Sequence, residues 1–153
     1  MKKISLLVLI LSAIFINATA QTENPKYNKA LADSLGGDQY GMKMYYLVIL
    51  KTGTNQTTDK EKVSSIFRGH MDNITRLANE GKLVVAGPLG KNENQYRGIF
   101  IFAVKTKKEI EDLLQTDPAI KEKILAPEIY EWYGSAALPK YLEYHDKIEK
   151  SKH

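Results

Sequence analysis

Apolar residues follow two spacings along the chain, and these spacings predict four strands and two main helices. Continuous apolar runs rich in β-branched and aromatic residues are typical of buried strands. Apolar residues that return every three or four positions are typical of the buried face of a helix. The expected strands are 42–51, 82–86, 96–104 and 124–134, and the expected helices are 59–80 and one that begins at Thr106.

Residues typical of turns and helix caps mark the boundaries of these elements. Gly87-Pro88 is expected to close the second strand as a turn. The segment Thr106-Lys107-Lys108-Glu109 has the spacing of a capping box and indicates the start of the second helix. Asp117-Pro118 supplies an N-cap and a first residue for a further helical turn. Pro127 has no N–H to donate, which favours a sheet edge or a bulge for the last strand.

This order of elements, βαββαβ, predicts an α+β domain of the ferredoxin-like class with a four-stranded antiparallel sheet over residues 42–135. Two helices can cover only one face of the sheet, yet the strands are apolar at consecutive positions and therefore require burial on both faces. A second copy packed sheet against sheet is the expected cover, which predicts a homodimer. The competing explanation is that the charged C-terminal tail, 136–153, folds over the sheet.

The N-terminus has the three-part pattern of a secretory signal peptide. Lys2 and Lys3 precede the almost wholly apolar run Ile4 to Ile16, and Ala18-Thr19-Ala20 follows it. A bilayer-spanning helix needs roughly 20 apolar residues, so this run favours a cleaved leader, 1–20, over an uncleaved anchor. The mature chain is expected to begin near Gln21, to be periplasmic or secreted, and to have no membrane association.

Composition removes several classes of function. The chain has no cysteine, which excludes disulfides, a cysteine nucleophile and a lipid anchor at the cleavage site. Its net charge of +4 falls to +2 once Lys2 and Lys3 leave with the leader, and the remaining basic residues form no cluster typical of nucleic-acid binding. Residues 21–41 are polar and rich in turn formers, so they are expected to form an arm before the domain.

The apolar stripe of the first helix contains one histidine, His70. A histidine in this position is either a polar residue that the core tolerates or a working group. Asp117 and the Gly87-Pro88 turn fall at the end of the sheet where the first helix begins. His70 lies about 10 to 16 Å along that helix at about 1.5 Å per residue, so the topology permits a contact with Asp117 without requiring it.

Three segments of the chain carry a family resemblance: "GHMDNITRLANEGKLVVAGPLG", "YRGIFIF" and "TDPAIKEKILAPEIYEWYGS". Together they resemble the YCII-related (YciI-like) family of small dimeric α+β barrel proteins, and the resemblance covers about Met44 to Ser135. It implies a ferredoxin-like subunit, a sheet-to-sheet dimer and a pocket with a His-Asp pair. By position, His70 and Asp117 match the proposed catalytic pair, and Gly87 and Pro88 match the turn that borders the pocket.

The same resemblance suggests what the pocket does. Members of the family are linked to chlorinated-aromatic breakdown as dehydrochlorinase-like enzymes, and the wider fold includes lactone isomerases and cofactor-free monooxygenases. Where many relatives have Asp-Glu-Gly, this chain has Asn79-Glu80-Gly81, so residue 79 provides no acidic partner for the histidine.

Two functions therefore remain open. One is a cofactor-independent lyase or isomerase in which His70 moves a proton on a small cyclic or aromatic molecule while Asp117 orients the imidazole. The other is a non-catalytic dimer that binds a small ligand or acts as a scaffold. His145 and His153 show no ligand spacing to His70, so no metal site is expected. The sequence also lacks a phosphate-binding glycine loop.

Overall fold

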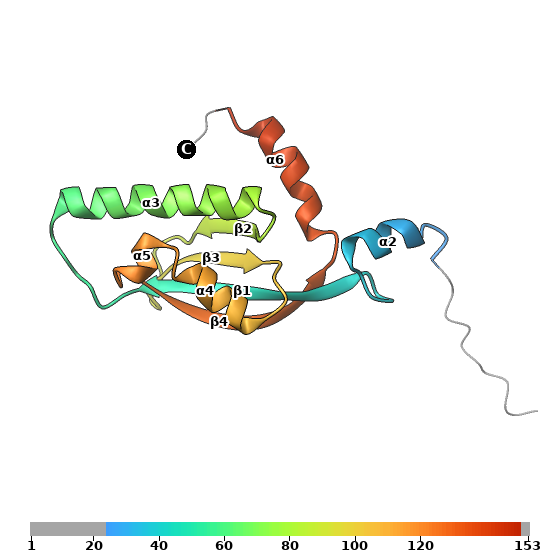
Figure 1. The fold of residues 1–153 in the computed structure, drawn as a ribbon, viewed down its shortest axis with the longest axis horizontal. Coiled ribbons are helices and arrows are strands. Elements are labelled where there is room, and N and C mark those ends of the chain that lie inside the picture. Colours follow the sequence, from blue (N-terminus) through green and yellow to red (C-terminus); the bar gives the residue numbers. More distant parts are fainter. Residues whose placement is uncertain (1–23, 151–153) are drawn as a thin grey trace, which may run out of the picture.

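A four-stranded antiparallel sheet with the strand order β2-β3-β1-β4 forms the centre of the fold (Figure 1). The computed structural model describes residues 24–150, apart from the side chain of residue 146. The strands are β1 Met42–Thr52, β2 Leu83–Pro88, β3 Tyr96–Phe102 and β4 Leu125–Ser135. The helices are α2 Lys29–Leu35, α3 Lys60–Asn79, α4 Lys107–Leu114, α5 Pro118–Lys121, the short 3₁₀ helix η1 Leu138–Tyr141 and α6 Leu142–Ile148.

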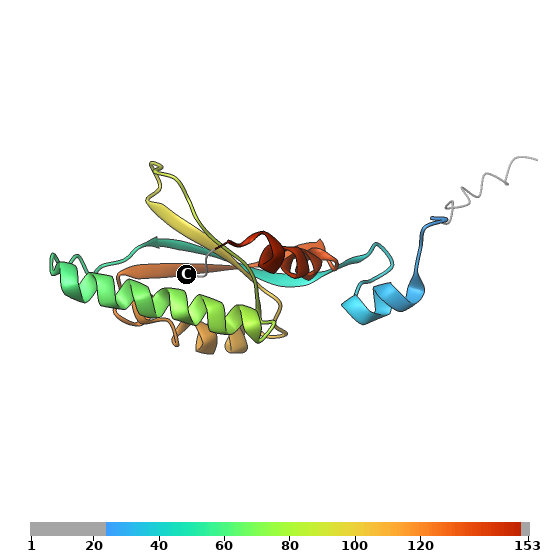
Figure 2. The ribbon, with the colours of Figure 1, turned by 90° about the horizontal axis from the view of Figure 1, so that it is seen from above.

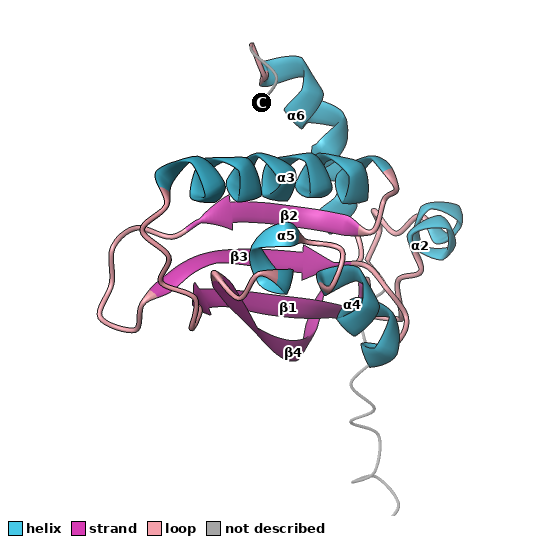
Figure 3. Ribbon diagram, turned by 60° about the vertical axis from the view of Figure 1, so that its left-hand side comes forward, coloured by secondary structure: helices cyan, strands magenta, loops and turns pink. Residues whose placement is uncertain are grey.

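The arrangement is the predicted ferredoxin-like α+β fold. Helices α3, α4 and α5 lie on one face of the sheet (Figures 2 and 3). Their starts follow the local sequence, because side-chain oxygens satisfy backbone N–H groups that have no partner inside the helix. Asp59 accepts from the Lys62 N–H at 3.0 Å, and Thr106 accepts from the Glu109 N–H at 3.1 Å. Pro127 lies in β4 at an edge of the sheet, as expected of a residue without an N–H.

The prediction that Gly87-Pro88 closes the second strand as a turn was wrong. β2 continues through both residues, and Gly87 and Pro88 pair with Ile99 and Gly98 of β3. Because β2 is the other edge strand, the missing N–H of Pro88 leaves no neighbouring strand unpaired. The connection to β3 begins only after Pro88, so this dipeptide extends the edge of the sheet.

The main core lies between the sheet and the three helices. Alternate residues of β1 and β3 point toward the helices, and Phe100 and Phe102 meet edge to face with ring centroids 5.7 Å apart. These residues pack against the apolar stripes of α3 and α4 that the sequence predicts. The buried side chains of this core include Tyr46, Val48, Leu50, Ile66, Leu77, Leu83, Phe100, Phe102, Ile110 and Leu113.

The opposite face of the sheet is covered at one end only. There Tyr45, Val84 and Ile101 are buried, and Leu138 of the C-terminal segment packs against them. Leu47, Ile49 and Ile99, in the middle of this face, stay half-buried, and Tyr130 is 48% exposed. The C-terminal segment thus covers part of the second face of the sheet. The rest of this apolar face stays uncovered in the single chain.

The N-terminal arm contains a helix, α2, that the sequence analysis did not predict. Asn28 caps its start by accepting from the Leu31 N–H at 3.0 Å, and Gly36 ends it in the left-handed conformation at φ 69°. The predicted signal peptide, 1–20, lies outside the described residues. Within residues 24–150, no helix combines the length and the apolar character that a membrane crossing requires.

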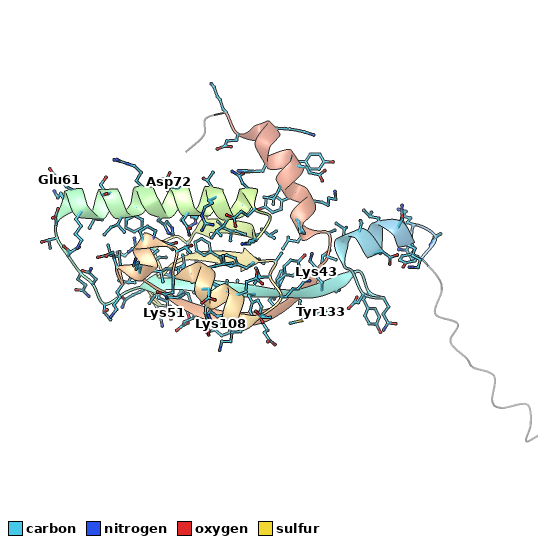
Figure 4. All side chains as sticks on the ribbon, in the orientation of Figure 1. Lys43, Lys51, Glu61, Asp72, Lys108 and Tyr133 are labelled. Carbon is cyan, nitrogen blue, oxygen red and sulfur yellow. The ribbon has the colours of Figure 1, made fainter. Side chains whose placement is uncertain are left out.

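A contact between Asp38 and Tyr133 ties the arm to the end of β4. The Tyr133 hydroxyl donates to the Asp38 carboxylate, which also accepts from the Tyr40 and Met42 N–H groups at 2.8 and 3.0 Å. Figure 4 shows Tyr133 at the end of the sheet beside α2. This hydrogen bond raises the pKa of Tyr133 to about 12 and lowers the pKa of the Asp38 carboxyl.

We expect Asp38→Asn to return the pKa of Tyr133 from about 12 toward its ordinary value of 10.0. A raised pKa means that this contact stabilises the fold below pH 10 and that its contribution disappears as pH rises through 12. Because the pKa of Asp38 is lowered, its contribution is present above 3.8 and disappears as pH falls through the lowered value. NMR titration of ¹³C-labelled Tyr133 measures the shift, and an unchanged titration in Asp38→Asn would contradict it.

Candidate active site

His70 and Asp117 lie in direct contact between α3 and the start of α5. The His70 Nδ1 is 2.7 Å from the Asp117 Oδ2, and the two side chains are 10% and 1% exposed. An ionised carboxylate can only accept a hydrogen bond, so Nδ1 carries the shared hydrogen and neutral His70 holds its lone pair on Nε2. The two residues that the resemblance singles out are therefore brought together by the fold.

Two aromatic rings fix the plane of the His70 imidazole. Phe100 stacks on it at a centroid distance of 5.9 Å and an interplanar angle of 29°. Phe67 meets it edge-on at 5.8 Å and 81°. A ring held on its face, its edge and one nitrogen has little rotational freedom, so the direction of Nε2 is set before any ligand arrives.

Each oxygen of Asp117 has a separate partner. Oδ2 faces His70, while Oδ1 accepts from the Ala119 N–H at 2.9 Å and caps α5. Asp117 therefore caps α5 and contacts His70 at the same time. The cap also fixes the carboxylate in space, because the backbone of α5 holds the oxygen that does not contact His70.

Gly69 allows α5 to lie close enough for this contact. A Cβ atom added at Gly69 would stand 3.0 Å from the Pro118 Cγ, closer than side chains normally approach. Glycine within a helix costs about 1 kcal/mol relative to alanine, so its position in the middle of α3 reflects this packing. The neighbours of His70 and Asp117 in sequence, Gly69 and Pro118, thus set the distance between the helices.

A polar network next to the pair was missed by the sequence analysis. The Arg76 guanidinium donates to the Asn73 Oδ1 at 2.8 Å and to the Thr116 hydroxyl at 3.0 Å, and that hydroxyl lies 2.9 Å from the Asn73 Oδ1. These bonds join α3 to the residue before Asp117. The available signal was the position of Asn73, which follows His70 by one helical turn on the same buried face.

A cavity of about 550 Å³ opens beside His70, between α3, β2 and the C-terminal segment. This size suits a small organic molecule. The residues that line it include Leu50, Phe67, His70, Met71, Ile74, Ala78, Leu83, Val84, Ala86, Gly87, Pro88, Arg97, Gly98, Phe100, Leu125, Tyr141, Leu142 and His145. Gly87 and Pro88 are therefore in the cavity wall, as strand residues.

The free nitrogen of His70 is available to this cavity. Within the described part of the chain, Nε2 has no hydrogen-bond partner, and no fully buried side-chain nitrogen or oxygen lacks one. Nε2 must therefore have accessible surface, and His70 lines only this cavity among the described pockets. An oriented imidazole with an available lone pair in an apolar enclosure is suited to act as a general base.

The profile of the muconolactone delta-isomerase family matches residues 44–129 of the chain. The chain belongs to this family. Members share the dimeric α+β barrel superfamily with YciI-like proteins, and the narrower YciI-like assignment is not confirmed. The matched residues contain most of β1, all of α3, β2, β3, α4 and α5, and the first part of β4, and so include both His70 and Asp117.

One solved structure with detectable similarity is 5-chloro-2-hydroxyhydroquinone dehydrochlorinase (TftG) from Burkholderia phenoliruptrix AC1100, in complex with 2,5-dihydroxybenzoquinone. It is 20% identical, the match covers 57% of this chain and 92% of that chain, and the TM-score is 0.42. A comparison with curated proteins found no match.

Asn79, a metal site and His145 are the other candidates named from the sequence. Asn79 is exposed at the last residue of α3, nine positions and about 13 Å along the helix from His70. In residues 24–150, no group of three or more His, Cys, Asp or Glu side chains is arranged to hold a metal ion. His145, which the sequence analysis set aside, lines the same cavity as His70.

We expect Asp117→Asn to reverse the tautomer of neutral His70. Asparagine has one carbonyl oxygen, and if that oxygen keeps the cap on Ala119 then its NH₂ group faces the His70 Nδ1, which must accept. The hydrogen then moves to Nε2, and replacing a charge-assisted hydrogen bond by a neutral one costs about 1 kcal/mol of stability. Long-range ¹H–¹⁵N NMR at a pH where the imidazole is neutral distinguishes the tautomers.

The matched control for this change is Asp112→Asn, an exposed carboxylate on α4. It should leave His70 protonated on Nδ1, as in the unmodified chain. The same tautomer in Asp117→Asn and in the control would contradict the orienting role of Asp117.

Proposed function

We propose that the protein is an isomerase that moves a proton on a small cyclic molecule, with His70 as the base and Asp117 as its orienting partner. The observation that carries the proposal is the 2.7 Å contact between Nδ1 and Asp117, which leaves Nε2 directed at an apolar cavity. Membership of the muconolactone delta-isomerase family supports the reaction class. A lactone of that kind is of a size that a 550 Å³ cavity holds.

The proposed reaction needs only one base. The Nε2 lone pair takes a proton from the sp³ ring carbon at the far end of the conjugated C=C–C=O system, and the electrons of the broken C–H bond pass into a dienolate. The imidazolium then returns the proton to the carbon next to the carbonyl, and the double bond shifts. Atoms and charge balance over the two steps, and His70 ends in its starting form.

Asp117 assists each step without losing its charge. It holds the imidazole in the tautomer that can accept a proton at Nε2, and its negative charge stabilises the imidazolium that forms. The Phe67 and Phe100 contacts keep the ring in place while the proton moves. General-base catalysis by a positioned side chain contributes about 10²–10⁴-fold to a rate.

The same first step also leads to a lyase reaction if the substrate carries a leaving group. Removal of a proton beside a carbon that bears chloride allows the carbanion electrons to form a double bond and expel the chloride. The geometry of His70 supports either outcome, and the substrate decides between them. The alternative function, a dimer that binds a ligand without turnover, has the same cavity and differs only in the fate of the bound molecule.

The direct test is the isomerisation of muconolactone, followed by NMR in D₂O. We expect His70→Gln to lower kcat/KM by about 10²–10⁴-fold, and Asp117→Asn to lower kcat on the order of 10²-fold, because it presents the wrong tautomer. Asp112→Asn, the exposed control, should retain full activity.

Turnover that survives His70→Gln would contradict the proposed base. If the unmodified protein binds the lactone at His70, seen as a shift of its ring resonance, but does not convert it, the non-catalytic alternative holds for this substrate. Failure of the lactone to perturb His70 at any concentration would contradict both functions for this ligand class.

We also propose that the mature protein, from Gln21 onward, is an exported homodimer joined through the second face of the sheet, with residues 42–135 as its domain. The proposal is supported by three apolar residues on that face that stay half-buried in the single chain, Leu47, Ile49 and Ile99. The sequence pattern of residues 1–20 supports export.

We expect light scattering to give twice the monomer mass and Tyr130→Lys to yield a monomer. Tyr130 is 48% exposed on the second face, so a lysine there places charge in the interface with little cost to the isolated fold. Tyr144→Lys, at a 65% exposed position on α6, is the control. A folded monomer before mutation would contradict the dimer.

N-terminal sequencing of the exported chain should begin at Gln21.

A further inference from the structure

We propose that His145, in the C-terminal segment, is a specificity-determining residue that binds an anionic oxygen of the ligand at the mouth of the cavity. His145 lies beyond residues 44–129, the part of the chain that the family profile matches. It nevertheless lines the same cavity as His70. The inference rests on the proposed function of that cavity and adds the class of ligand it takes, a small cyclic carboxylate or phenolate.

An irregularity in β2 fixes the path of the C-terminal segment. The register between β2 and β3 shifts between Leu83 and Val85, so Val84 has no paired residue in β3. The Tyr141 hydroxyl donates to the Val84 carbonyl, and the burial of this hydroxyl raises the pKa of Tyr141. Together with Leu138, which packs on the second face of the sheet, this bond anchors the base of α6 at the edge of the cavity.

Helix α6 presents one face to the cavity. Leu142 and His145 of α6 line it together with Tyr141, the last residue of η1. Residues 141 and 145 are four positions apart and therefore adjacent on the surface of the helical segment. Tyr144 and Ile148 are 65% and 79% exposed and are not part of the lining. Met71, Ile74 and Ala78 of α3 line the same cavity, so α3 and α6 border it from two sides (Figures 1 and 2).

The ionisable groups around the cavity favour an anion. His70, His145 and Arg97 line it together with Tyr141, and among the described residues no aspartate or glutamate does. No described side chain forms a hydrogen bond or ion pair with the His145 ring, so its donor is available to a ligand. The remaining lining is largely apolar and aromatic, which suits the ring of the ligand. An anionic substituent would then be bound at the mouth while the ring reaches His70.

The test compares benzoate with neutral benzamide, which has the same ring and no charge. The full chain has three histidines, so the ring resonances of His70 and His145 can be followed individually by NMR and assigned from His→Gln variants. We expect benzoate to shift both resonances and to bind at least tenfold more tightly than benzamide. His145→Gln should weaken benzoate about tenfold and leave benzamide unchanged.

Tyr144→Phe, on the outer face of α6, is the matched control and should bind both probes as the unmodified protein does. Benzoate that shifts His70 but binds equally well to His145→Gln would overturn the role of His145 and leave the proposed function intact. Equal binding of benzoate and benzamide would overturn the anionic ligand class. If neither probe shifts His70, the inference and the proposed function both fail for aromatic ligands.

Discussion

The organisation of this protein depends on a carboxylate and an imidazole that meet inside a helix-to-helix contact. Asp117 is 1% exposed, and removing a charged group from water is costly unless hydrogen bonds replace the lost hydration. Here the replacement comes from the α5 backbone on one oxygen and from His70 on the other. The contact therefore determines how α5 must lie against α3, and at the same time it gives the imidazole a defined tautomer and direction.

Several features from different parts of the sequence support this one contact. Gly69 permits the close approach of Pro118, and the Asn73, Arg76 and Thr116 bonds hold the segment before Asp117 against α3. Phe100, on β3, stacks on the face of the His70 imidazole. As a result, a group that would be mobile on a surface is held rigidly at the wall of an apolar cavity, which is the arrangement that a small positioned base requires.

The sequence predicts features that depend on neighbouring residues along the chain. It does not predict features that depend on contacts between distant segments. The caps at Thr106 and Asp117 were predicted because each side chain bonds a backbone N–H two or three residues ahead. The continuation of β2 through Pro88 depends on its position at the sheet edge, and the approach of Asp117 to His70 depends on how α5 crosses α3. The place of His145 depends on a bond between Tyr141 and the Val84 carbonyl, which periodicity cannot reveal.

In the proposed mechanism, His70 acts through Nε2 on a ligand held in the cavity while Nδ1 stays bound to Asp117. A crystal structure of the mature protein with a small cyclic lactone bound would show both contacts at once. We expect a ring carbon or its attached hydrogen to face Nε2 at about 3–3.5 Å, with the Asp117 bond preserved. A ligand bound away from His70, or an imidazole turned so that Nδ1 leaves Asp117, would contradict it.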